Sequence, residues 1–122
     1  MRKSFKELPE KILGADVVVK FDVAHWIFGP LRVSAGPAED FQETSNGFVP
    51  PKNGWIVGYH FRDHPSVFRA AKDHLEVEQI VLEYVSTARM SLECEIAVAN
   101  SNLLAFDALT TPTVRRRKRH EP

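Results

Sequence analysis

The chain has 122 residues, equal numbers of acidic and basic side chains, and a hydrophobic content of 43%. This size and composition exclude a disordered or fibrous protein and predict a small domain that buries a core without metal or disulfide support. The single cysteine, Cys94, allows no internal disulfide, so we expect a reducing compartment and a buried, inert thiol. The apolar segments are too short or too charged for a signal peptide or a bilayer span, which predicts a soluble, cytoplasmic protein.

The basic residues are placed unevenly along the chain. Residues 1–114 carry 11 basic and 15 acidic side chains, whereas a run of five cations follows at Arg115, Arg116, Arg117, Lys118 and Arg119. We therefore predict a single compact domain over residues 1–111 and a basic, flexible tail over residues 112–122.

The first half of the chain favours a short helical segment within residues 4–13, followed by β-structure. Apolar residues alternate over 15–28 and again over 55–61, and residues 31–34 fit a short return strand. Alternation of this kind is typical of strands with one buried face. A small antiparallel sheet is the expected result.

A long loop is predicted over residues 35–54, where Gly, Pro and Asn recur throughout. Loops of this length in compact domains often form binding surfaces. Phe41 and Phe48 are apolar residues in this polar segment, so they are candidate anchors for a partner. The alternative is that both fold back onto the core.

The second half contains 46 residues, 66–111, without Gly or Pro. Twelve residues in steps of three and four define a helical stripe, and ten of them are apolar: Val67, Ala71, His74, Glu78, Val81, Val85, Ala88, Leu92, Ile96, Ala99, Leu103 and Phe106. A helix of that length would reach about 69 Å, against a radius of gyration of about 14 Å for a compact chain of this size. It must therefore project or fold back.

We expect a fold-back near Ser86 and Thr87, whose side chains compete for backbone hydrogen bonds. The predicted class is thus α+β, with the antiparallel sheet packed against a helical pair. The alternative is a β-hairpin of residues 77–85 and 90–98 that extends the sheet, because residues 90–98 also alternate.

Two polar residues, His74 and Glu78, interrupt the helical stripe one turn apart. Such a pair fixes the register of a helical partner when it is buried in an interface. The alternative is that the stripe drifts at this point and leaves the pair exposed.

The metal-ligand residue types gather in one cluster, which comprises His60, Asp63, His64 and His74 and is joined by His25 if its strand lies next to them. The spacing of His60, Asp63 and His64 lies across a strand end and a turn and matches no zinc motif. The sequence also lacks a phosphate-binding loop and a nucleophile motif. We therefore expect no metal, no cofactor and no catalytic residue.

These observations favour a non-enzymatic protein that binds another protein or copies of itself, as an inhibitor, an immunity-type partner or a component of a larger particle. Its candidate contacts are Phe41, Phe48, His74 and Glu78. The alternative is a nucleic-acid-binding protein that uses Arg115 to Arg119, since adjacent cations bind phosphates without sequence preference.

Overall fold

The computed structural model describes residues 5–41 and 51–111. Its elements follow the chain as η1 (Phe5–Glu7), β1 (Lys11–Ile12), β2 (Ala15–Asp16), β3 (Val18–Lys20), β4 (Val23–Phe28), β5 (Leu31–Pro37), η2 (Ala38–Asp40), β6 (Trp55–Phe61), β7 (Val67–Ala71) and α1 (His74–Thr110). The chain divides into two units, Met1–Ala88 and Arg89–Pro122, and the point of division falls within α1.

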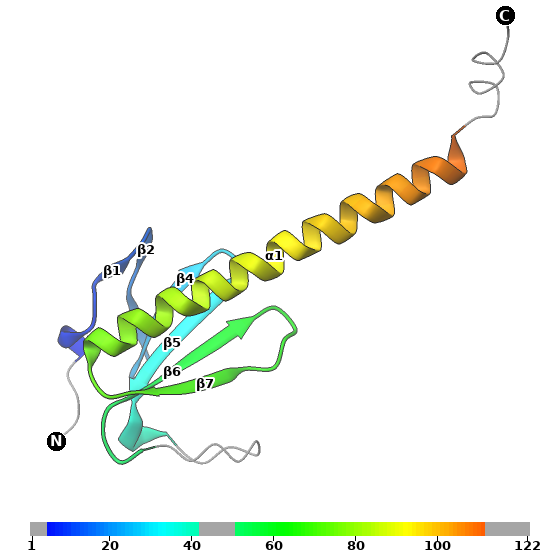
Figure 1. The fold of residues 1–122 in the computed structure, drawn as a ribbon. Helices are drawn as coiled ribbons and strands as arrows, with labels where there is room; N and C mark the ends of the chain where they lie inside the picture. The colour runs from blue at the N-terminus through cyan, green and yellow to red at the C-terminus, as the bar shows by residue number, and fades with distance from the viewer. Residues whose placement is uncertain (1–4, 42–50, 112–122) are drawn as a thin grey trace, which may run out of the picture. The chain divides into compact units, whose positions relative to one another are not determined.

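Strands β3 to β7 form a five-stranded antiparallel sheet in which every strand pairs with its neighbour in sequence (Figure 1). Strands β1 and β2 form a separate two-stranded sheet. The larger sheet has more strands than predicted, with β3 at one edge and β7 at the other.

The single strand expected over residues 15–28 is instead divided by a tight turn at Phe21 and Asp22. Both residues have left-handed backbone angles, with φ of 53° and 61°. Two successive residues with positive φ match the twist of a two-residue hairpin, in which Asn-Gly or Asp-Gly is the usual pair. Phe21 is costly there, so the sequence pattern gave no indication of the turn.

The core lies on one face of the larger sheet, where the first part of α1 packs. Its largest fully buried side chains are Trp26, Trp55 and Phe61. The N-terminal segment contributes to the same layer: Trp26 donates its indole N–H to the Pro9 carbonyl at 3.3 Å, and the Phe5 ring packs against Trp55 at 5.7 Å.

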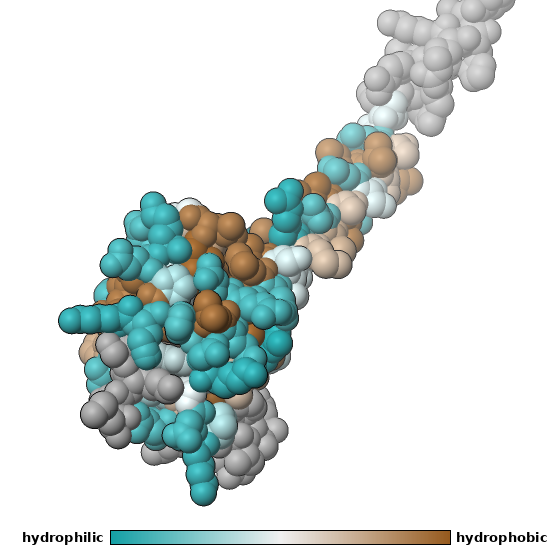
Figure 2. Space-filling view, turned by 60° about the vertical axis from the view of Figure 1, so that its left-hand side comes forward, coloured by the Kyte–Doolittle hydropathy of each residue, from teal (hydrophilic) through white to brown (hydrophobic). Residues whose placement is uncertain are grey.

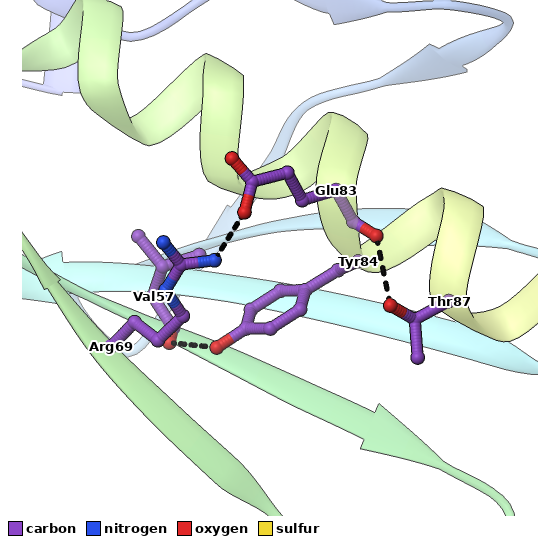
Figure 3. Close-up of polar contacts among 5 residues, drawn as sticks. All are labelled: Val57, Arg69, Glu83, Tyr84 and Thr87. Carbon is purple, nitrogen blue, oxygen red and sulfur yellow. Dashed lines mark hydrogen bonds and ion pairs between the residues drawn. The ribbon is translucent and has the colours of Figure 1, made fainter.

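The predicted helical pair is wrong, because His74–Thr110 is one continuous α-helix. The expected break does not occur at Ser86 and Thr87. The Thr87 hydroxyl instead donates to the Glu83 carbonyl at 3.1 Å (Figure 3), so its hydrogen bond is made within the helix rather than against it. The alternative hairpin of residues 77–85 and 90–98 is wrong for the same reason, since both segments are helical.

The helix begins later than predicted because residues 67–71 are needed at the sheet edge. Strand β7 pairs with β6 from Trp55 to Tyr59 and satisfies backbone groups of that buried strand. The helix start is then fixed by a reciprocal cap. The Glu76 backbone N–H donates to the Asp73 carboxylate at 2.9 Å, and the Lys72 backbone N–H donates to the Glu76 carboxylate at 3.0 Å.

Two side-chain contacts hold the first part of α1 on the sheet (Figure 3). Tyr84 packs against Tyr59 at 5.1 Å and donates its hydroxyl to the Val57 carbonyl at 3.4 Å. Burial raises the pKa of Tyr84 to about 12. Beside it, Arg69 of β7 forms an ion pair with Glu83 at 2.5 Å.

Across residues 5–41 and 51–111, no helix combines the length and apolar character that crossing a membrane requires.

Candidate functional site

The buried side of α1 is confined to its first four turns. Val77, Val81, Tyr84 and Ala88 follow one another in steps of four, three and four, and Ile80 lies beside them. All five are buried. This spacing is typical of a helix that packs one face against a sheet or another helix.

A second apolar stripe follows on the C-terminal part of the helix. From Ala88 the apolar series takes two successive steps of four, to Leu92 and Ile96, and then returns to steps of three and four through Ala99, Leu103 and Phe106. An extra step of four shifts an apolar seam around the helix axis. We call Leu92, Ile96, Ala99, Leu103 and Phe106 the C-terminal stripe.

The C-terminal stripe is exposed from Ile96 to Phe106 and half-buried at Leu92, unlike the buried series before it. Ile96, Leu103 and Phe106 are 60%, 57% and 63% accessible to solvent, and Ala99 is exposed as well. Its spacing is that of core positions in a coiled coil, where such residues insert between those of a facing helix. The arrangement is therefore suited to a helical partner.

Apolar side chains also occur outside the C-terminal stripe on the same helical segment. Met90, Val98, Leu104 and Leu109 are all more than half exposed. Figure 2 shows brown, hydrophobic residues interspersed with polar ones along this part of α1. Residues 96–106 contain no charged side chain. A helix that is apolar on several sides is usually buried by something else.

The predicted partner residues are scattered over the structure. Phe41 is half-buried and its ring packs on Phe68 at 5.0 Å. His74 is the exposed first residue of α1, and Glu78 is half-buried one turn later. Phe48 lies outside the described residues, as do Arg115 to Arg119. Their partner and nucleic-acid roles stay predictions.

The His60, Asp63 and His64 set is not brought together into a metal site. His64 packs against the Phe61 ring at 5.1 Å, whereas His60 hydrogen-bonds to Ser34 and Ser66. Because Phe61 and His60 are consecutive in β6, their side chains lie on opposite faces of the sheet. Within the described ranges, no group of three His, Cys, Asp or Glu side chains is placed to hold a metal ion.

Two residues are more exposed than the sequence predicts, Cys94 and Phe21. Cys94 is exposed rather than buried. Phe21 is 97% accessible at the β3–β4 turn and lines an open hollow of about 430 Å³ together with Asp22 and Phe41. The alternating pattern of residues 15–28 had assigned Phe21 to a strand face, and no sequence signal separated it from its neighbours.

Comparisons were made with protein-family models, with curated proteins and with solved structures, and none of them gave a significant match.

Proposed function

We propose that the protein is an assembly module that pairs with a second copy of itself through the C-terminal stripe. The observation that carries this proposal is the exposed series at coiled-coil spacing, Ile96 to Phe106, on a helix whose preceding apolar series is already buried. Two heptads of apolar contact support a weak, concentration-dependent interaction rather than a permanent one.

The charges of the chain favour an antiparallel pair. Residues 74–95 carry five acidic side chains and one basic one, and the uncharged segment 96–106 separates them from the five cations at 115–119. Two chains running in parallel would place like charges at the same level. An antiparallel pair centred on residues 96–106 directs the basic run of each chain towards the acidic stretch of the other, which is the more favourable arrangement.

Sedimentation equilibrium of the full chain over a range of concentrations tests the proposal. We expect a monomer–dimer equilibrium that is lost when Ile96→Glu and Leu103→Glu are combined. Glutamate retains a high helix propensity, so the helix itself should persist in circular dichroism. A chain that remains monomeric at every concentration would contradict the proposal.

A matched control is available on the same segment. Met90→Glu combined with Leu104→Glu introduces the same charges at exposed apolar positions outside the C-terminal stripe. This variant should retain most of the association. If both double variants dissociate equally, general apolar adhesion rather than the C-terminal stripe drives the contact.

Nucleic-acid binding through the basic run is the second candidate function, supported by five adjacent cations. It predicts a salt-sensitive mobility shift of labelled DNA or RNA that disappears when residues 115–122 are deleted. The same deletion should weaken self-association only moderately, because the C-terminal stripe is retained. The absence of a shift at low salt would dismiss this candidate.

A further inference from the structure

The face of the sheet opposite the core carries a cluster of histidine, arginine and serine side chains. His25 on β4 is paired with Ser34 on β5, and Arg32 on β5 is paired with His60 on β6. Directly paired residues of an antiparallel sheet share a face. Since Val57 and Tyr59 face α1, these four residues face the other way, and we call this side the open face.

His60 is held by hydrogen bonds at both ring nitrogens. Its Nε2 lies 2.9 Å from the Ser34 Oγ, and its Nδ1 lies 2.8 Å from the Ser66 Oγ. A neutral imidazole has one donor and one acceptor nitrogen, so one serine accepts from the ring and the other donates to it. The ring is thereby fixed between one buried and one exposed hydroxyl.

Gly58 makes this arrangement possible. A Cβ at position 58 would lie 2.6 Å from the Ser34 Oγ and 2.7 Å from the His60 Nε2. Any larger residue would therefore displace the hydrogen bond between them. Glycine weakens a strand interior, and it often marks a place where other groups must approach closely. Here those groups are the polar side chains of the open face.

The second histidine has a defined tautomer. An Arg32 Nη1 lies 3.2 Å from the His25 Nδ1, and because a guanidinium only donates, this nitrogen is the acceptor. The proton of neutral His25 is then on Nε2. Arg32 joins the two histidines, since it bonds to His25 and is the direct cross-strand neighbour of His60.

The strands of the open face carry cations and no carboxylate, whereas Asp22 and Asp40 line a hollow at its edge beside Val23 and Gly36. The thirteen strand positions of the open face in β3 to β7 include Lys20, His25, Arg32 and His60 but no Asp or Glu. Within the part of the chain that the structure describes, Arg32 forms no ion pair. Arg32 is also exposed, so the guanidinium N–H groups that do not bond to His25 are accessible to an external anion.

The pKa values of both histidines follow from this environment. Burial, followed by the charges of Arg32 and His25, lowers the pKa of His60 to about 4. Burial, followed by the charges of Arg32 and Lys20, also lowers the pKa of His25. An anion bound beside Arg32 would oppose the cationic charges and favour protonation of both rings.

Two other uses of the cluster fit less well. A metal cation would be repelled by Arg32, which already occupies the His25 Nδ1. Acyl transfer by Ser34 or Ser66 would need His60 as a base with a carboxylate to stabilise the imidazolium. The neighbour of His60 is instead the Arg32 guanidinium. The low pKa of His60 also makes this histidine a weak base near neutral pH.

We propose that the open face binds an oxyanion of the phosphate type through Arg32, His25 and the Ser34–His60–Ser66 relay. Arg32 supplies the paired N–H donors that suit such an anion. When His60 gains a proton, both of its ring N–H groups donate to the serines, and the exposed Ser66 hydroxyl turns its own proton towards the anion. Binding is therefore coupled to proton uptake and strengthens as the pH falls.

The test is a pH titration of the histidine ring C–H resonances of the full chain by NMR, with and without sulfate at constant ionic strength. Sulfate keeps its double charge near neutral pH, so only protein groups titrate. His25→Gln and His60→Gln assign the resonances. We expect sulfate and inorganic phosphate to raise the pKa of both histidines by about one. Unchanged titration curves would overturn the proposal.

Variants separate a built site from a general charge effect. Arg32→Gln should abolish the sulfate-induced rise in the histidine pKa values. Arg32→Lys should lower the affinity for sulfate roughly tenfold, because lysine keeps the charge but not the paired donors. Lys11→Gln removes one exposed cation elsewhere and should change nothing. Both Arg32 variants keep the fold if the fluorescence of buried Trp26 and Trp55 is unchanged. An equal response in Arg32→Gln and the intact chain would refute the assignment.

The source of the anion is distinguished by further probes. The affinities of adenosine monophosphate and inorganic phosphate are compared. Tighter binding of adenosine monophosphate would identify a phosphate ester as the ligand, whereas equal affinities would identify the free anion. Acetate that acts as strongly as sulfate overturns the phosphate class. This site is on the sheet and does not depend on self-association, so the Ile96→Glu and Leu103→Glu variant should bind sulfate normally.

Discussion

The two halves of α1 share one continuous helix and differ in what stabilises them. Up to Ala88, the series Val77, Val81, Tyr84 and Ala88 is buried against the sheet, although Leu75 and Leu82 of the same half are exposed; from Ile96 onward, apolar residues are exposed. Apolar content alone therefore does not distinguish a core face from a contact face. What distinguishes the two series is the sheet, which covers the first, whereas Ile96, Leu103 and Phe106 are exposed.

This difference has an energetic consequence. The first half is held by burial of apolar area, at roughly 25 cal/mol per Å². The second half gains little from burial within its own chain, although most helical stability in proteins comes from packing of an apolar face. A partner on the C-terminal stripe would supply the missing stabilisation.

The largest contrast is expected from truncating one aromatic residue in each half. Tyr84→Ala should lower the free energy of unfolding by about 3 kcal/mol or more, because it empties a buried site. Phe106→Ala should change it by less than about 0.5 kcal/mol while weakening self-association roughly tenfold. Urea unfolding followed by tryptophan fluorescence measures the first unit alone, since Trp26 and Trp55 both lie there.

The same pair of variants can contradict the comparison. Equal losses of unfolding free energy would mean that the C-terminal half is part of the same cooperative unit. A Phe106→Ala chain with unchanged sedimentation behaviour would remove Phe106 from the contact.

The sequence predicted the C-terminal stripe correctly as a helical series, and it missed the phase of the first half. The predicted stripe contained two of the five buried helix residues, Val81 and Ala88, but it ran through His74 and Glu78 and omitted Val77, Ile80 and Tyr84. The predicted series runs one residue too late in the first half of the helix, with Glu78 in place of Val77 and Val85 in place of Tyr84. The Asp73 and Glu76 cap was visible in the sequence and would have placed the helix start correctly.

The sheet was predictable only in part. Residues 55–61 alternate clearly and form β6, but β7 followed without Gly or Pro before the helix and was read as helical. The open-face cluster could not be predicted, because Ser34 and His60 meet across 26 positions. Such contacts depend on strand register, which a local pattern does not specify.

The next largest expected effect is the loss of stability when a carboxylate is removed from one end of the helix or the other. Asp73→Ala should destabilise the first unit by about 1 kcal/mol, because the Glu76 backbone N–H loses its cap. Asp107→Ala is the matched control: it removes a carboxylate from the exposed half and should leave the unfolding free energy unchanged within about 0.5 kcal/mol. Urea midpoints measured by tryptophan fluorescence compare the two. A similar loss in both variants would show that general charge, not capping, is responsible.

A pH effect of similar size is expected in the first unit. The pKa of His60 in the folded chain is about 4, below its ordinary value of 6.5. The folded state thus favours neutral His60, so this contribution is complete above pH 6.5 and is lost as the pH falls towards 4. Since His60 is half-exposed, solvent screening reduces the contribution to about 1 kcal/mol. His60→Gln should flatten the fluorescence-detected stability profile in that range, and Lys11→Gln should not.

The smallest contrast lies between two ion pairs. Arg69 and Glu83 join β7 to α1 at 2.5 Å, whereas Arg89 and Glu93 lie 3.5 Å apart within the exposed half of the helix. A double-mutant cycle with methionine for arginine and glutamine for glutamate should give about 0.5–1 kcal/mol for the first pair and about 0.3 kcal/mol for the second. Thermal unfolding by circular dichroism in low and high salt provides the measurement. Of these two pairs, Arg69 and Glu83 are the less exposed and join two elements, so their coupling should persist in salt better than that of Arg89 and Glu93. The reverse ranking would mean that the exposed half is more ordered than its solvent exposure implies.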